Sequence, residues 1–241
     1  MRVLLLGGTA EARQLAQILH PQVDVTSSLA GRVPDPRLPE GSVRIGGFGG
    51  VDGLQRWLMQ HRTDVVVDAT HPFAATITAH AAQACAALGL PHLVLSRSPW
   101  ECDAAVRVAS DSEAAQLVTQ RSFQRIFLTT GRSGTAAFAD SDAWFLIRAV
   151  TAPEVSRLPR RHHVVLSRGP YWYADEYDLL SEYDIEVLVT KNSGGDMTRA
   201  KLDAAAALGI PVVMVDRPLL PAGVRIVHTV DGAAGWVLGQ R

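Results

Sequence analysis

Short runs of hydrophobic residues alternate along the chain with longer segments in which hydrophobic residues recur at helical spacing. Residues 3–6 form the first run, and Ala12, Leu15, Ala16 and Leu19 then fall on one face of a predicted helix. Continuously apolar strands separated by helices are typical of parallel strands covered on both faces, because a crossover between parallel strands needs a helix. We therefore predict an α/β fold, with further buried strands at 65–67, 93–95, 126–128, 164–166, 187–189 and 212–215.

The sequence also repeats itself at an interval of about 120 residues. Residues 86–91 read AALGLP and residues 206–211 read AALGIP, and each copy continues into an apolar run and an arginine. The repeat predicts two Rossmann-like domains with parallel sheets, residues 1–120 and 121–241, and an active site in the cleft between them. A strand–helix segment at the end of each half also repeats, and whether the halves exchange these segments stays open.

Composition and charge narrow the classes of protein. With 47% hydrophobic and 20% charged residues among 241, the chain can form a substantial core, which excludes a disordered protein. The net charge of −1 argues against a nucleic-acid partner, and no apolar run approaches the roughly 20 residues of a membrane helix. The sequence opens without a secretory signal, so we expect a cytoplasmic protein in which Cys85 and Cys102 are reduced. The histidines lack the spacing of metal ligands, and no metal is expected.

A glycine-rich turn follows the first predicted strand. Gly7, Gly8, Thr9, Glu11 and Ala12 surround the start of the first helix, whose N-terminal amides can hold a phosphate. The segment departs from the G-x-G-x-x-G dinucleotide pattern, because Thr9 and Ala12 take the places of the second and third glycines. It predicts a pyrophosphate site, and a purely structural turn is the alternative.

The end of the second predicted strand bears on the choice of nucleotide. A domain specific for NAD usually has Asp or Glu there, because a carboxylate accepts hydrogen bonds from the ribose hydroxyls. This chain has hydroxyl side chains, among them Ser28, and then Arg32. A hydroxyl donor and a guanidinium suit a 2′-phosphate, so the segment favours NADP(H). A solvated loop arginine is the alternative.

A polar loop directly follows the predicted strand at 65–67 and contains Asp68, Thr70, His71, Pro72 and Phe73. Ligands of open parallel sheets bind at the carboxyl ends of the strands, so this loop is expected to reach the cofactor. His71 and Phe73 could bracket a nicotinamide ring, whereas a lone histidine is more often structural or exposed.

The second half carries positive charges at the corresponding strand ends. Arg132 and Arg168 follow predicted strands, and Lys191, which the repeat aligns with His71, begins a glycine-rich loop. These three cations suit a large, flat ligand with several carboxylates better than a second nucleotide, and surface charges without a ligand are the alternative. Neighbouring residues assigned to the same site are Gly131, Tyr171, Trp172, Ser193, Gly194 and Asp196.

Five segments together resemble the precorrin-6A reductase family of the cobalamin pathway. They are LGGTAEA at 6–12, SLAGR at 28–32, DATHPFA at 68–74, Arg97 with Trp100, and KNSGG at 191–195. The resemblance implies two Rossmann-like domains with the cofactor mainly on the first. It also implies an NADPH-dependent oxidoreductase that reduces the C18–C19 double bond of precorrin-6A to give precorrin-6B. The same reaction on cobalt-precorrin-6A is an alternative, and so is a two-lobed NADP(H)- or tetrapyrrole-binding module without turnover.

The resemblance further implies a division of roles. The protein holds the two ligand rings in contact, and His71, Lys191 and Asp196 are candidate proton donors in competition with water. The expected partner is the macrocycle itself, with hand-over to neighbouring enzymes of the pathway. The implied substrate-binding residues are Arg97, Gly131, Arg132, Arg168, Lys191, Ser193, Gly194 and Lys201. The implied cofactor-binding residues are Gly7, Gly8, Thr9, Glu11, Ala12, Ser28, Arg32, Asp68, Thr70, His71, Pro72 and Phe73.

Overall fold

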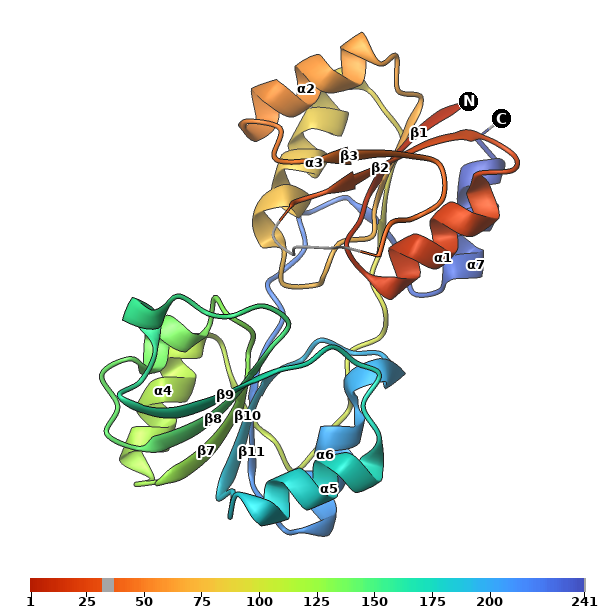
Figure 1. Ribbon diagram of the computed structural model, residues 1–241. Helices are drawn as coiled ribbons and strands as arrows, with labels where there is room; N and C mark the ends of the chain where they lie inside the picture. Colours follow the sequence, from red (N-terminus) through yellow and green to blue (C-terminus); the bar gives the residue numbers. More distant parts are fainter. Residues whose placement is uncertain (32–36, 241) are drawn as a thin grey trace. The chain divides into compact units, whose positions relative to one another are not determined.

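The computed structural model describes residues 1–31 and 37–240, which fold into two compact α/β units (Figure 1). The first unit contains residues 1–98 and 218–241, and the second contains residues 99–217. Each unit has one six-stranded sheet whose neighbouring strands are all parallel. The predicted α/β fold with two parallel sheets is confirmed.

The sheet of the first unit has the strand order β12-β5-β4-β1-β2-β3. The chain runs outward from β1 to β3 and then returns to pair β4 with the other side of β1. This reversal is the point at which doubly wound sheets bind their ligands. The strands are β1 (Arg2–Leu6), β2 (Asp24–Leu29), β3 (Ser42–Ile45), β4 (Val65–Asp68), β5 (His92–Leu95) and β12 (Arg225–Val227).

Helices cover both faces of this sheet. Helices α1 (Ala10–Leu19) and α7 (Val230–Leu238) pack together on one face, where the red α1 lies beside the blue α7 in Figure 1. Helices α2 (Gly50–Gln60) and α3 (Ala75–Leu88) cover the other face. Successive side chains of β1 alternate between these two cores, so the whole strand is apolar, as the sequence pattern predicts.

The sheet of the second unit has the order β6-β11-β10-β7-β8-β9. Helices α5 (Tyr173–Glu182) and α6 (Ala200–Ala207) pack together over one core, and α4 (Asp111–Gln120) contacts the 3₁₀ turn η1 (Thr135–Phe138). This short turn follows β7, at the place where the first unit has α1 after β1. The strands are β6 (Val106–Val108), β7 (Arg125–Thr129), β8 (Trp144–Ala149), β9 (Arg161–Leu166), β10 (Val187–Lys191) and β11 (Val212–Val215). Two further 3₁₀ turns are η2 (Val155–Arg157) and η3 (Asp196–Thr198).

The terminal strand–helix segments of the two halves belong to the opposite units. Strand β6, from the first half of the sequence, pairs with β11, and β12, from the second half, pairs with β5. The units therefore differ from the halves 1–120 and 121–241 that the repeat suggests. The pairing has an energetic reason, because α7 buries Ala233, Ala234 and Val237 in the core of the first unit.

Strand register also shows that the interval of the repeat is not constant. Residues of β5 and β11 correspond at an interval of 120, but the residues with which they pair on β4 and β10, such as Asp68 and Thr190, are 122 apart. Lys191 therefore corresponds to Ala69, and its alignment with His71 is wrong. The chain between these strands is two residues shorter in the second unit, and a constant interval conceals that difference.

Both cysteines are free thiols, and burial raises the pKa of the Cys85 thiol to about 12. Every helix in the described part of the chain is too short or too polar to cross a bilayer. The described residues also contain no group of three His, Cys, Asp or Glu side chains that could hold a metal ion.

Candidate functional site

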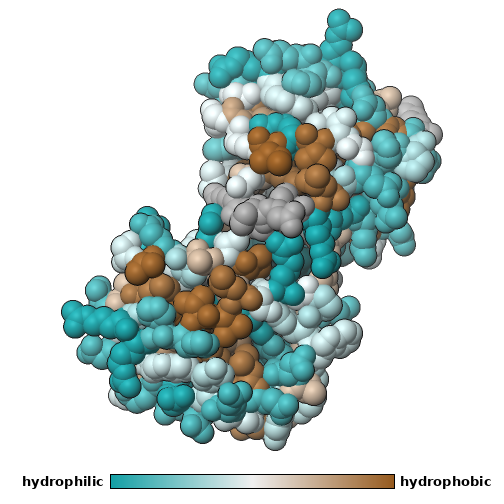
Figure 2. Space-filling model, in the orientation of Figure 1, coloured by the Kyte–Doolittle hydropathy of each residue, from teal (hydrophilic) through white to brown (hydrophobic). Residues whose placement is uncertain are grey.

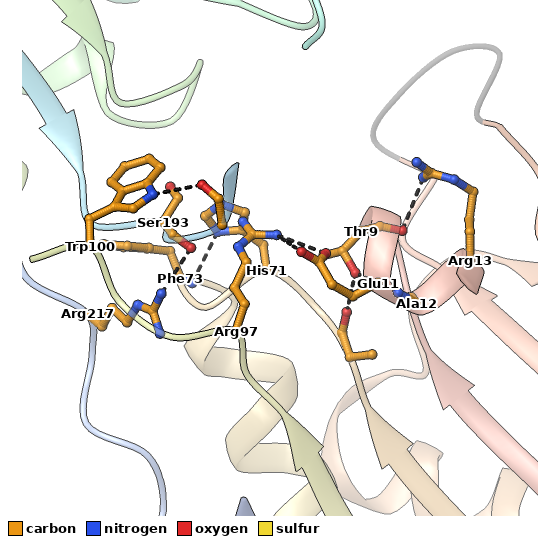
Figure 3. A network of polar contacts seen from close by, with 12 residues as sticks. Thr9, Glu11, Ala12, Arg13, His71, Phe73, Arg97, Trp100, Ser193 and Arg217 are labelled. Carbon is orange, nitrogen blue, oxygen red and sulfur yellow. Dashed lines mark hydrogen bonds and ion pairs between the residues drawn. The ribbon is translucent and has the colours of Figure 1, made fainter. Parts of the chain in front are cut away.

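Thr9 joins two of the predicted cofactor loops in the first unit. It is the extended N-cap of α1, and its Oγ1 accepts a hydrogen bond from the Ala12 amide at 3.1 Å. The same hydroxyl donates to the Ala69 carbonyl at 2.8 Å, so the turn after β1 is tied to the loop after β4 (Figure 3). Thr9 is thus a structural cap that leaves the other first-turn amides of α1 open to an anion.

The glycines of this turn meet two different demands. Gly8 has a φ of +112°, which favours glycine, whereas Gly7 lies close to the helix, where an added Cβ would be 3.5 Å from the Ala12 Cβ. A small residue at Ala12 therefore lets the helix start close to the strand. The turn thus has the close approach of strand and helix that a dinucleotide site requires, although the sequence has only part of the dinucleotide pattern.

Glu11 and Arg97 form an ion pair at the same edge of the first sheet. The Arg97 Nη1 donates to both carboxylate oxygens of Glu11, at 3.0 and 3.1 Å, and both side chains are largely buried (Figure 3). Glu11 belongs to the predicted cofactor set and Arg97 to the predicted substrate set, and the structure brings them together on one unit. The pair removes the net negative charge that Glu11 would present to a phosphate at the start of α1.

The loop after β4 is shaped by Asp68. Its Oδ1 accepts hydrogen bonds from the Thr70 amide at 3.0 Å and the Thr70 hydroxyl at 2.6 Å, while its Oδ2 is buried without a partner among the described residues. Burial lowers the pKa of the neighbouring His92 imidazole, and the negative charge of Asp68 opposes that effect. The main role of Asp68 in this structure is therefore to fix the conformation of the loop.

His71 and Phe73 lie next to each other, with ring centroids 5.8 Å apart. The Phe73 amide donates to the His71 Nδ1 at 3.2 Å, so a neutral His71 carries its proton on Nε2. A ring held between two others needs about 7 Å, twice the usual contact distance. The two rings can border a nicotinamide in this arrangement, but they cannot enclose it.

These loops line a small cavity at the carboxyl ends of β1, β4 and β5. The cavity is bordered by the turn after β1, by the loop after β4 and by the segment that follows β5. Its lining residues are Thr9, Glu11, Ala69, Thr70, Pro72, Leu95 and Arg97.

Arg44, a cation that the sequence analysis did not assign to the site, lies on β3 next to the end of β2. Ser28 pairs in register with Arg44 of β3, and the Ser28 Oγ accepts a hydrogen bond from the Arg44 Nη1 at 2.7 Å. The Arg44 guanidinium lies 3.8 Å from the centre of the Phe48 ring, and partial burial lowers its pKa. Arg32, predicted beside Ser28, lies outside the described residues.

In the second unit, Lys191 is already paired. Its Nζ lies 3.0 Å from the Asp111 Oδ2, and both side chains are mostly buried. Asp111 is the first residue of α4, the helix that the first half of the sequence contributes to this unit. Asp111 Oδ1 and the nearby Thr130 hydroxyl are buried without a hydrogen-bond partner among the described residues. The ion pair holds the Lys191 ammonium at the strand ends and partly neutralises it.

The loop after β10 is held by Trp100 and Asn192. The Trp100 amide donates to the Asn192 Oδ1 at 2.8 Å, and the Asn192 Nδ2 donates to the Trp100 carbonyl at 3.2 Å. The indole Nε1 also donates to the Gly195 carbonyl at 2.8 Å (Figure 3). Arg217 donates to the carbonyls of Asn192 and Ser193, at 2.8 and 3.0 Å. The backbone of this loop is therefore fixed on both sides, and Gly194 has the positive φ that its turn requires.

The remaining predicted residues of the second unit differ in exposure. Arg132 and Arg168 are exposed and form no ion pair with a described residue. Asp196 is exposed in η3. Lys201 is only 3% exposed, and its ammonium donates to the Thr198 carbonyl and lies over the Trp100 ring. The surroundings of Lys201 give it a structural role in this loop.

Large apolar side chains are exposed at the end of β9, on the loops after β9 and β10, and on α5. Leu166, Trp172 and Met197 are 57%, 67% and 40% exposed, and Tyr173 and Tyr177 follow on α5. The Tyr171 amide donates to the Met197 carbonyl at 3.0 Å, which joins the loops after β9 and β10. Figure 2 shows hydrophobic surface on the unit that carries β9. Exposed apolar and aromatic side chains on loops that also carry Arg168 suit a flat anionic ligand.

An ion pair between β8 and α5 is deeply buried. Arg148 of β8 donates from both terminal nitrogens to Glu176 of α5, and the side chains are 6% and 2% exposed. The guanidinium also lies 3.7 Å from the centre of the Tyr171 ring, whose hydroxyl donates to the Ser167 carbonyl at 3.0 Å. The pair therefore supports the loop that carries Arg168.

Comparison with known proteins places this geometry in a family. The model of the family described as Precorrin-6x reductase CbiJ/CobK matches residues 2–238. The chain belongs to the precorrin-6x reductase family. A precorrin-6A reductase of Mycobacterium tuberculosis is 68% identical over 238 residues, which cover 99% of this chain and 98% of that protein. A precorrin-6A reductase of Rhodococcus erythropolis is 53% identical over 242 residues, with 98% and 97% covered.

A solved structure supports the same assignment. The structure titled CobK precorrin-6A reductase has a TM-score of 0.92 and 37% identity, and the similarity covers 100% of this chain and 97% of that one. Both units and both sets of strand-end loops lie within the region that the precorrin-6x reductase family shares. The chain is thus an oxidoreductase, as the motifs predict.

Three residues that the structure brings to the candidate site were not assigned to it from the sequence. Arg44 lies on a short, half-exposed strand whose pattern is too weak to place it beside β2. Asn192 was seen only as part of a motif. Asp111 was placed in the domain 1–120, although its helix belongs to the second unit. Ser110 and Glu113 mark the start of that helix, since the Ser110 Oγ accepts from the Glu113 amide and the Glu113 carboxylate accepts from the Ala109 amide.

The buried ion pair gives a stability prediction. Glu176→Gln leaves the Arg148 charge buried without its counter-charge, so we expect a loss of about 3–5 kcal/mol in the free energy of unfolding. Glu182→Gln, at an exposed site of the same helix, is the matched control and should change stability by less than about 0.5 kcal/mol. Urea unfolding of both variants measures the difference, and equal losses would contradict the structural role of the pair.

Proposed function

We propose that this chain reduces precorrin-6A to precorrin-6B with NADPH, and that the first unit binds the cofactor and the second binds the macrocycle. The observation that carries the proposal is the contrast between the two strand-end sites. One has a glycine turn at a capped helix N-terminus, and the other has exposed apolar side chains and exposed arginines on the loops that follow its strands. The relatives with 68% and 53% identity are both named precorrin-6A reductase, which supports the metal-free substrate.

The first unit suits a dinucleotide for three reasons. The turn at Gly7 and Gly8 brings the backbone close to a helix whose N-terminal amides favour a pyrophosphate. Arg97 neutralises Glu11 beside that position. The end of β2 offers the Ser28 hydroxyl and no carboxylate at that position, which favours NADPH over NADH.

The second unit suits a tetrapyrrole with several carboxylates. Trp172 and the neighbouring apolar side chains offer a surface for the ring system, and burying that surface is favourable at about 25 cal/mol per Å². Arg132 and Arg168 are exposed and can pair with carboxylates at the rim. Gly131, Ser193 and Gly194 supply backbone around the same position.

The chain's residues orient the reactants and supply the proton. NADPH supplies a hydride when it is bound. His71 and Phe73 would border the nicotinamide of a bound cofactor, and the loop shape that Asp68 imposes keeps the two side chains in place. Lys191, held by Asp111, is the proposed proton donor to the carbon opposite the hydride, and His71, Asp196 and water are the other candidates.

The reaction is tested directly with the purified chain. Incubation with precorrin-6A and NADPH should consume the reduced nicotinamide and yield a product with two more hydrogens by mass spectrometry. NADH should be a poorer donor, and cobalt-precorrin-6A should turn over more slowly than the metal-free substrate. Binding of both ligands without turnover would contradict the proposal and indicate a carrier module. Faster turnover of cobalt-precorrin-6A than of precorrin-6A would show that the proposed substrate is wrong.

Lys191→Met tests the division of roles between the units. The variant keeps the side-chain stem and loses the charge, so kcat/KM for the macrocycle should fall about 10- to 150-fold, as for a lost charged hydrogen bond. The affinity for NADPH, measured by fluorescence titration, should stay within about twofold of wild type. Arg160→Met removes an exposed charge from the same unit and should leave both unchanged. A large loss of NADPH affinity with unchanged macrocycle kinetics would reverse the assignment.

A further inference from the structure

Arg44 is held in a fixed position at the carboxyl end of β3. Its Nη1 donates to the Ser28 Oγ at 2.7 Å and to the Gly46 carbonyl at 2.9 Å, and its Nη2 donates to the Gly47 carbonyl at 3.0 Å. The Phe48 ring covers the guanidinium at 3.8 Å from its centre. An arginine fixed in this way loses little conformational entropy when it binds a ligand.

Two donors of this guanidinium remain. An arginine has five N–H groups, and the three hydrogen bonds leave the Nε–H and one N–H of Nη2 without an acceptor among the described residues. These groups form the fork with which arginine grips a phosphate or a carboxylate. Ser28 accepts from Arg44 through its oxygen, so its own hydrogen is also left to donate.

Among the described residues, no carboxylate forms an ion pair with Arg44, although the guanidinium is partly buried. A partly desolvated cation without a carboxylate partner gains more from binding an anion than a solvated one does. Arg44 thus has the features of an anion site that is built before its ligand arrives.

We propose that Arg44, with the hydroxyl of Ser28, binds the 2′-phosphate of NADPH and sets the preference for this cofactor over NADH. The inference rests on the proposed function and names the residue that distinguishes NADPH from NADH. The position supports it, because Ser28 is the next-to-last residue of β2, and doubly wound domains meet the ribose hydroxyls at this strand end. A 2′-phosphate on that ribose can accept hydrogen bonds from the remaining N–H groups of Arg44 and from the Ser28 hydroxyl.

Isothermal titration with adenosine 2′,5′-bisphosphate and with 5′-AMP tests this inference on the full chain. The two probes differ in the 2′-phosphate, so their affinity ratio isolates its contribution. Arg44→Met should lower the affinity for the bisphosphate about 10- to 150-fold, the range for a lost hydrogen bond to a charged group. The affinity for 5′-AMP should change by less than about twofold. Arg225→Met removes an exposed arginine from β12, the opposite edge strand of the same sheet, and should leave the ratio unchanged.

The inference is overturned if Arg44→Met weakens the binding of both probes equally, or weakens the binding of neither. Should that variant fail to fold, Arg44→Lys decides the question, because lysine keeps the charge but loses the fork. The ratio should then fall at least about threefold, and an unchanged ratio overturns the inference. The proposed function fails separately, if wild-type protein consumes no NADPH with precorrin-6A, whatever the titrations show.

Discussion

The pairing of each sheet with a strand from the other half of the chain is the constraint on which both sites depend. Strand β6 completes the second sheet beside β11, and β12 completes the first beside β5. The exchanged helices follow these strands, so α4 brings Asp111 to Lys191, and α7 fills the core beneath α1. A site residue of the second unit thus comes from the first half of the sequence.

Within each unit, hydrogen bonds between loops fix the positions of the loops, whereas apolar packing fixes the sheets. Thr9 ties the turn after β1 to the loop after β4, and Trp100 ties its own segment to the loop after β10. Such contacts fix loops whose backbone groups would otherwise need water. They also explain why two residues of the predicted sites, Thr9 and Lys201, have their polar groups engaged by the protein itself.

The sequence predicted the parts of the structure that follow from local pattern. Most of the buried strands and α1 could be predicted because apolar periodicity depends on neighbours in the chain. The strand predicted as buried at 164–166 is an exception, because β9 lies at the edge of its sheet and leaves Leu166 57% exposed. Arg44 could not, because its place beside Ser28 depends on the register of a short edge strand. The alignment of Lys191 with His71 was wrong because the second unit is two residues shorter between the strands, which only strand pairing reveals.

The central claim is that the first unit alone binds the nucleotide, and hydrogen–deuterium exchange of the full chain with and without NADPH measures it most directly. The account predicts slower exchange of the amides at 7–12 and 44–48, where the turn after β1 and the end of β3 lie. It predicts unchanged exchange at 131–134 and 192–195 in the second unit. Protection confined to these second-unit segments would contradict it.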